Sequence, residues 1–103
     1  MNRTLVLSAA PYFRKASESS GKEGIQIDLL LQTKMSYCIV EVKRKASIGR
    51  EVIEEVERKR RLLSHPKSVS VRTALVYEGE LAPSVEADGF FDAIVRFRDL
   101  LGV

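Results

Sequence analysis

The clearest hydrophobic pattern lies between Ile25 and Lys43, where two runs of alternating apolar and polar residues flank a short polar turn. The first run extends from about Ile25 to Gln32, the second from about Tyr37 to Lys43, and the turn is Thr33 to Ser36. Because alternation with a period of two is typical of β-strands, this stretch predicts an antiparallel hairpin. A symmetric turn pairs Thr33 with Ser36 and fixes the register of the two strands.

That register gathers polar residues on one face of the predicted hairpin. It places Asp28 opposite Glu41 and Gln26 opposite Lys43. Residues opposite each other share a face, as do residues two apart along a strand, so all four side chains are expected to converge. The apolar face is expected to hold Ile27, Leu29, Leu31, Cys38, Val40 and Val42.

Two facing carboxylates require compensation. At a separation of about 5 Å they repel each other by roughly 3 kcal/mol at an effective dielectric constant near 20. A cation between them, a raised pKa on one of them, or the nearby Lys43 would relieve this repulsion. Since Lys43 offers one positive charge against two negative ones, a divalent ion such as Mg²⁺ suits the pair, and proteins commonly hold Mg²⁺ with one or two carboxylates.

The segment before the hairpin predicts one strand and a loop. A strand begins near Leu5, is interrupted at Pro11 and resumes at Tyr12 to Arg14. A proline within a strand implies an edge strand or a bulge. The Ser-, Gly- and Lys-rich stretch 16–24 reads as a mobile loop. Lys15 directly before this loop and Lys22 within it are potential phosphate contacts, although solvated loop lysines are the simpler interpretation.

The segment after the hairpin predicts a charged amphipathic helix. Ser47 is a suitable N-cap, and an apolar stripe with one gap indicates a helix from Ile48 to Leu63 or Ser64. Glutamates fill its first half and basic residues its last, an order that suits the helix dipole. The basic cluster Arg58 to Arg61 therefore has a structural explanation, and contact with nucleic acid is the alternative.

Two further strands and a short final helix complete the prediction. Strands are expected at 69–77 and 93–97, a loop at 78–88 with a helical turn after Pro83, and a helix at 98–101. The resulting order of three strands, one crossover helix and two strands predicts an α+β (α/β) fold.

Composition narrows the class of protein without identifying it. The chain has 103 residues, which suits one domain, and a net charge of +3, which permits a polyanionic partner without demonstrating one. The single cysteine, Cys38, is expected to be a buried core thiol, and its isolation suits a reducing compartment. With no apolar run long enough to span a membrane, a soluble cytoplasmic protein is expected. His65 has no cysteine partner, which argues against a zinc site.

The acidic hairpin resembles the PD-(D/E)XK nuclease superfamily. In that comparison Asp28 is the acidic residue of the second strand, and Glu41-Val42-Lys43 is the (D/E)XK motif of the third. A closer similarity, to the C-terminal nuclease-like domain of certain prokaryotic AAA-type ATPases, covers most of the chain. It is carried by residues 11–15, 24–28, 41–43, 91–92 and 99–101.

The resemblance implies a fold and a chemistry. It implies a restriction-endonuclease-like mixed β-sheet with an antiparallel hairpin and a crossover helix, formed by residues 1–103 as a single domain. It also implies metal-dependent cleavage of DNA, with Asp28 and Glu41 holding Mg²⁺ or Mn²⁺. Lys43 would then orient the attacking water or stabilise the transition state, and Gln26 would be an accessory polar contact. Candidate nucleic-acid contacts are Arg44, Lys45, Arg58, Arg60 and Arg61.

Three functions stay open on the sequence alone. The first is the metal-dependent nuclease, and the second is a non-enzymatic module that binds DNA or a neighbouring ATPase domain of the same parent chain. The third is a dimerisation domain, so a homodimer is also left open. The superfamily usually has a helix before its first strand, whereas only Met1 to Thr4 precede Leu5 here; either that helix is lost or the chain is a piece of a longer one. No phosphate-binding glycine loop is present, so the ATPase activity itself would lie elsewhere.

Overall fold

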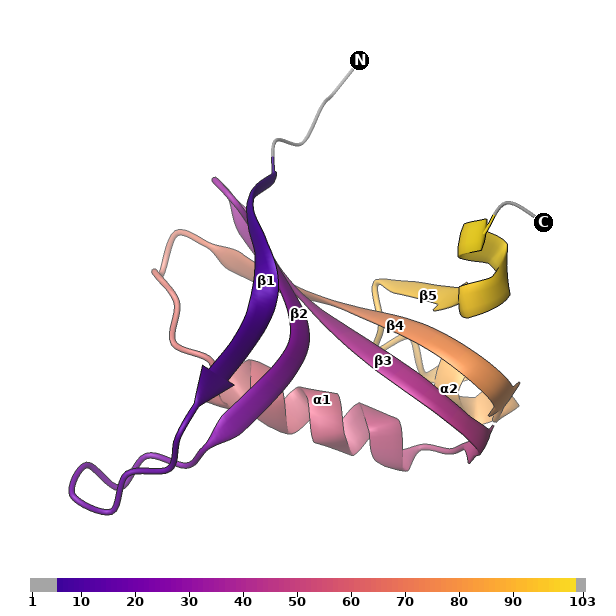
Figure 1. Cartoon of the computed structure of the whole chain (residues 1–103), viewed down its shortest axis with the longest axis horizontal. Coiled ribbons are helices and arrows are strands. Elements are labelled where there is room, and N and C mark those ends of the chain that lie inside the picture. Colours follow the sequence, from indigo (N-terminus) through magenta and orange to yellow (C-terminus); the bar gives the residue numbers. More distant parts are fainter. Residues whose placement is uncertain (1–5, 102–103) are drawn as a thin grey trace.

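A computed structural model of the chain, which describes residues 6–101, contains a five-stranded mixed sheet with strands in the order β1-β2-β3-β4-β5 (Figure 1). The strands β1, β2 and β3 are antiparallel neighbours, whereas β3, β4 and β5 run parallel. Their bounds are β1 Val6–Arg14, β2 Ile25–Thr33, β3 Ser36–Ile48, β4 Ser70–Leu81 and β5 Ala93–Arg96. The helix α1 (Glu51–Leu62) connects β3 to β4, α2 (Pro83–Asp88) connects β4 to β5, and the 3-10 helix η1 (Phe97–Leu101) ends the described chain. The predicted α+β class, the hairpin and the crossover helix are confirmed.

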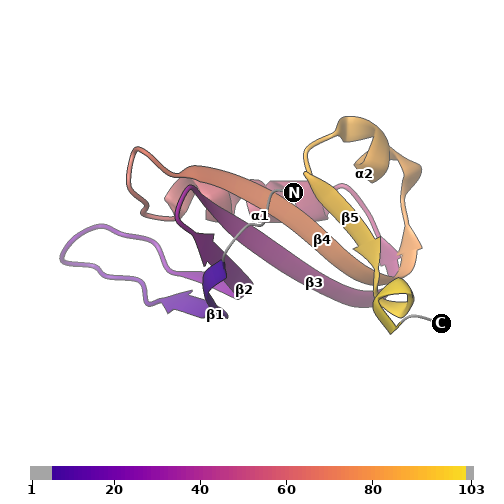
Figure 2. The ribbon, with the colours of Figure 1, turned by 90° about the horizontal axis from the view of Figure 1, so that it is seen from above.

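The hydrophobic core lies between the sheet and its two α-helices, which cover the same face of the sheet (Figure 2). Val52 and Val56 of α1 are buried together with Ile39 of β3, Leu75 of β4 and Val85 of α2. Each such side chain contributes about 1.5–3 kcal/mol when it is fully removed from water. None of the helices within residues 6–101 is long and apolar enough to span a bilayer.

Strand β1 has both features that a proline within a strand predicts, an edge position and an irregular register. It is one of the two edge strands of the sheet, and its pairing with β2 shifts register between Ala10 and Tyr12. The end of β1 is attached to α1, because a guanidinium nitrogen of Arg14 donates to the Leu62 carbonyl at 3.0 Å. The predicted start of this strand at Leu5 lies outside the described residues, and so does the segment before it. The loop expected at 16–24 carries an isolated β-bridge between Ser17 and Lys22.

The prediction for the start of the helix is wrong. Ser47 and Ile48 belong to β3, where they pair with Glu80 and Leu81 of β4 after an irregularity in the register. The N-cap of α1 is Arg50, whose side chain makes no capping hydrogen bond. Ile48 is fully buried, but it reaches the core from the strand. The apolar pattern could not separate the two cases, because a single buried residue suits either element.

Strand β4 is longer than its predicted range, so the loop expected to begin at Glu78 begins after Leu81. The helical turn expected after Pro83 is confirmed as α2. Gly79 lies in the added part of β4 with φ = +121°, and a Cβ atom there would collide with the Lys45 carbonyl oxygen. The parallel pairing of β3 and β4 therefore depends on a missing side chain at this position.

We expect Gly79→Ala to destabilise the protein by about 2 kcal/mol or more, because a strained backbone and a backbone clash add together. Gly89→Ala is the matched control, since Gly89 also has a positive φ, +77°, but nothing lies within 4 Å of its added Cβ. The control should cost only about 1–2 kcal/mol. Urea unfolding of both variants measures the difference, and equal losses would remove the clash from the explanation.

Cys38 differs from the prediction of a buried thiol. It is half-buried, and it lies on the face of β3 that points away from α1, because its neighbour Ile39 faces the core. Burial raises the pKa of the Cys38 thiol, and the charge of Asp92 raises it further while Arg72 opposes the shift. The thiol is thus protonated at neutral pH, which does not suit a nucleophile.

Candidate active site

The candidate site lies where β2 and β3 separate. The predicted register is confirmed for four pairs, from Gln32–Tyr37 to Leu29–Val40, and the ladder ends there. The expected direct pairs Asp28–Glu41 and Gln26–Lys43 are therefore wrong. The Val42 N–H donates a hydrogen bond of 2.9 Å to the Oδ2 atom of the Asp28 side chain. In a continued ladder, a backbone carbonyl would accept such a bond. The Asp28 carboxylate fills the gap between the diverging strands.

A bulge in β2 explains why the pairing stops. Ala10 of β1 pairs with Leu30 of β2, and Tyr12 pairs with Ile27. Two steps along β1 therefore correspond to three steps along β2, so β2 carries one extra residue. An extra residue interrupts the alternation of faces. Ile27 and Leu30 both join the buried core with Ile39, so the prediction that Ile27 shares a face with Val40 and Val42 is wrong. A bulge of this kind has no signature in the apolar pattern.

Strand β3 keeps its alternation and delivers two of the predicted residues to α1. Glu41 and Lys43 follow Ile39 at intervals of two and form ion pairs with side chains of α1. Glu41 is only 2% exposed, although it is a carboxylate. The (D/E)XK-like pair thus faces the helix, while Asp28 reaches the same region from the gap between the strands.

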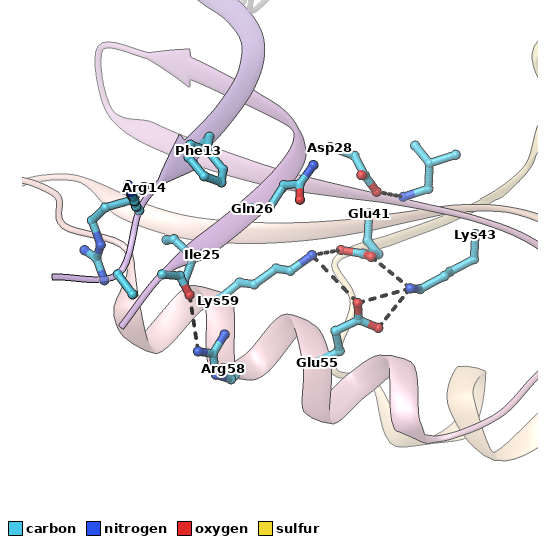
Figure 3. A pocket seen from close by; sticks show the side chains of 14 residues that line it. Phe13, Arg14, Ile25, Gln26, Asp28, Glu41, Lys43, Glu55, Arg58 and Lys59 are labelled. Atoms are coloured by element: carbon cyan, nitrogen blue, oxygen red, sulfur yellow. Dashed lines mark hydrogen bonds and ion pairs between the residues drawn. The ribbon is translucent and has the colours of Figure 1, made fainter. Parts of the chain in front are cut away.

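One pocket brings the four predicted site residues together (Figure 3). It has a volume of about 540 Å³ and opens between the end of β1, the first half of β2, the second half of β3 and α1. The residues that line it are Phe13, Arg14, Lys15, Ala16, Gly24, Ile25, Gln26, Asp28, Glu41, Val42, Lys43, Glu55, Arg58 and Lys59. Asp28 and Glu41 thus line one pocket from adjacent antiparallel strands, without being a direct cross-strand pair.

The buried Glu41 carboxylate lies between two ammonium groups. Its Oε1 atom is 2.8 Å from the Lys59 Nζ, and its Oε2 atom is 3.3 Å from the Lys43 Nζ. Lys43 also lies 2.9 Å from Glu55 of α1, which in turn is 3.9 Å from Lys59. We call Glu41, Lys43, Glu55 and Lys59 the four-charge network; two negative and two positive charges balance within it.

Two members of the four-charge network, Glu41 and Lys43, are predicted as site residues from the sequence, whereas Glu55 and Lys59 are not. Glu55 and Lys59 are an i,i+4 pair, which reads as a solvated pair on the helix surface. A signal was present, because Lys59 occupies the gap in the apolar stripe between Val56 and Leu63. A polar residue in such a gap faces the core side of the helix and needs a partner there.

Lys43 is held in its charged form. Burial lowers the pKa of Lys43, but hydrogen bonds to Glu55 and the charge of Glu41 outweigh this effect, so the pKa is raised above its ordinary value. The side chain is therefore an ammonium group throughout the neutral range. In a reaction it can stabilise negative charge or orient a water molecule, whereas it cannot serve as a general base.

The mouth of the pocket is basic. Arg58 donates to the Gly24 carbonyl at 3.2 Å and lies 3.6 Å from a carboxylate oxygen of Glu23, while Lys15, which also lines the pocket, is exposed. Beside them Phe13 is 71% exposed. Solvent-accessible positive groups around the buried Glu41 carboxylate suit a substrate that is anionic at its periphery.

The other candidate nucleic-acid contacts lie outside this pocket. The Arg44 guanidinium lies over the Phe97 ring at 5.8 Å, and that of Arg60 over the Phe90 ring at 4.8 Å. Lys45 forms an exposed ion pair of 3.3 Å with Glu51, and Arg61 is exposed. Of the five predicted contacts, only Arg58 lines the pocket.

The pocket is lined in part by carboxylates, which are the ligands that hard divalent ions take in proteins. Within residues 6–101, no group of three or more His, Cys, Asp or Glu side chains is arranged to hold a metal ion. Mg²⁺ needs fewer protein ligands, because it keeps several waters and often binds phosphate oxygens of its substrate. Asp28 and Glu41 both line the pocket and offer oxygen donors of this kind, but Lys59 lies 2.8 Å from the Glu41 Oε1 atom and would have to move away before an ion reached it.

No protein-family model matches this chain, and the comparisons with curated proteins and with solved structures give no significant match.

Proposed function

We propose that this chain is a metal-dependent nuclease-like domain that acts on DNA phosphodiester bonds. The observation that carries the proposal is the meeting of Asp28, Glu41 and Lys43 in one pocket at the point where β2 and β3 separate. Two carboxylates and an ammonium group are the donors required to hold a divalent ion beside a scissile phosphate and to stabilise its developing charge.

The arrangement of the sheet supports the same proposal. An antiparallel unit β1-β2-β3 is joined through α1 to the parallel strands β4 and β5, an arrangement that agrees with a restriction-endonuclease-like core. The acidic residues come from the second and third strands, as the resemblance to PD-(D/E)XK nucleases implies. The proposal also includes an origin in a longer chain with an AAA-type ATPase domain.

The residues of the pocket have distinct roles in this proposal. Asp28 and Glu41 would hold Mg²⁺ or Mn²⁺, which supplies Lewis acidity and lowers the pKa of an attacking water. Lys43, kept as an ammonium group by its two acidic neighbours, orients that water or stabilises the charged phosphate. Gln26 offers a neutral polar contact, and Arg58 and Lys15 at the mouth bind flanking phosphates.

A second candidate is a non-enzymatic module that binds DNA or the neighbouring ATPase domain. One observation favours it: Glu41 already has two ammonium partners, so the four-charge network is neutral without a metal ion. In this case the network would stabilise the hairpin against α1, and only the basic mouth would contact the partner.

Cleavage of supercoiled plasmid DNA separates the two candidates. At low salt we expect the wild-type protein to nick the plasmid with Mn²⁺ and to leave it intact with EDTA, because the ion is required for the chemistry. Asp28→Asn should abolish the nicking, whereas Asp88→Asn, which alters a surface pair with Arg50, should retain it. Binding in a gel-shift assay without metal-dependent nicking would favour the non-enzymatic module. Equal nicking by Asp28→Asn would assign the activity to another site or protein.

A further inference from the structure

Lys59 occupies an unusual position for a lysine near the end of a helix. Its side chain is 12% exposed, and its ammonium group lies 2.8 Å from the Glu41 Oε1 atom at the bottom of the pocket. A lysine in the last turn of a helix usually extends its ammonium group into water, where it also interacts with the helix dipole. The inward orientation removes both charges from water, which has a cost in free energy.

The distribution of charge around the two proposed metal ligands is uneven. Glu41 has two ammonium groups within 3.3 Å, one at each oxygen. Asp28 forms no ion pair within the described part of the chain, and its recorded hydrogen bond, to the Val42 N–H, uses only Oδ2. Lys43 lies closer to Glu55, at 2.9 Å, than to Glu41, so Lys59 is the closer ammonium partner of Glu41. Asp28, by contrast, is exposed to solvent.

An alternative partner for Lys59 lies close by. The Glu55 Oε1 atom is 3.9 Å from the Lys59 Nζ, and Glu55 is 41% exposed. Lys59 can therefore leave Glu41 and keep an acidic partner by a change of its own rotamers, without movement of α1. Lys43 lies between the same two carboxylates, so Glu41 would still have one ammonium neighbour after this change.

We propose that Lys59 is an internal cation that occupies the place of the divalent ion beside Glu41 and withdraws toward Glu55 when the ion binds. This inference rests on the proposed metal site and adds a residue that positions one of its ligands. It follows that Lys59 competes with the ion: it stabilises the metal-free pocket and weakens the affinity for metal.

Titration with Mn²⁺ tests this competition. Lys59→Met keeps an unbranched apolar side chain and removes the charge, so we expect the dissociation constant for Mn²⁺ to fall by about tenfold relative to the wild type. The fraction of free Mn²⁺, followed by electron paramagnetic resonance at neutral pH, gives this constant without any activity assay. Lys59→Gln retains a hydrogen-bond donor for Glu41 and serves if the methionine variant does not fold. Lys45→Gln, which makes the same change in net charge outside the pocket, should leave the constant close to the wild-type value.

The possible results separate this inference from the proposed function. A tighter constant in a Lys59 variant, with the Lys45 control unchanged, supports the competition. If the wild type binds Mn²⁺ and the Lys59 variants bind it with an equal or larger dissociation constant, the competition is overturned and the metal site stands. A lysine with a purely structural role would alter the melting temperature and leave this constant unchanged. Absence of Mn²⁺ binding in the wild type and in all variants overturns the metal site and this inference together.

Discussion

Replacing Glu41 with alanine is expected to lower the free energy of unfolding by about 3–5 kcal/mol, because it removes the acidic partner of a buried ion pair. Glu41 is 2% exposed, and the two ammonium groups beside it would lose their common carboxylate. Lys59, at 12% exposed, would then have only the more distant Glu55 as a partner. Urea denaturation of the metal-free protein measures the loss.

Glu55→Ala is the matched control for this prediction. Glu55 belongs to the same network but is 41% exposed, so water can replace much of its interaction with Lys43. We expect it to cost about 0–1 kcal/mol, as exposed pairs do. A similar loss for the two variants would show that the burial of Glu41 does not determine the stability of the network.

The register of the hairpin could be predicted because both strands alternate and the turn is short. Thr33 and Ser36 form the predicted turn, where the Thr33 hydroxyl donates to the Ser36 carbonyl at 3.0 Å. With the turn fixed, each pair from Gln32–Tyr37 to Leu29–Val40 follows. The presence of Asp28, Glu41 and Lys43 in one region follows from the same reasoning.

The detailed geometry of the site could not be predicted from alternation. The bulge in β2 depends on how β2 pairs with β1 on one side and with β3 on the other, which a single strand's sequence does not show. The bulge prevents the direct pairing of Asp28 with Glu41. The role of Lys59 depends on how α1 packs against β3. Sequence spacing shows its i,i+4 relation to Glu55 and its place in the gap of the apolar stripe, but it does not show that its partner is Glu41. Likewise, the extension of β3 through Ile48 follows from pairing with β4. Tertiary contacts decided each of these features.

The effect of Mn²⁺ on stability is expected to be nearly as large as that of Glu41→Ala. A ligand that binds only the folded state stabilises it by about 2.7 kcal/mol at a concentration 100 times its dissociation constant. For a domain of this size that corresponds to a rise of roughly 10–20 °C in the melting temperature. Asp28→Asn should abolish the rise, because an amide is a far poorer ligand for the ion than a carboxylate. The amide oxygen can still accept the hydrogen bond from the Val42 N–H, so the fold should be retained.

Thermal melts of the wild type and Asp28→Asn, each with EDTA and with Mn²⁺, test the central claim that the acidic pocket is a divalent-metal site. The claim predicts a rise of roughly 10–20 °C with Mn²⁺ in the wild type and little or no change in the variant. A wild-type melting temperature that does not respond to Mn²⁺, or an equal rise in both proteins, would contradict it.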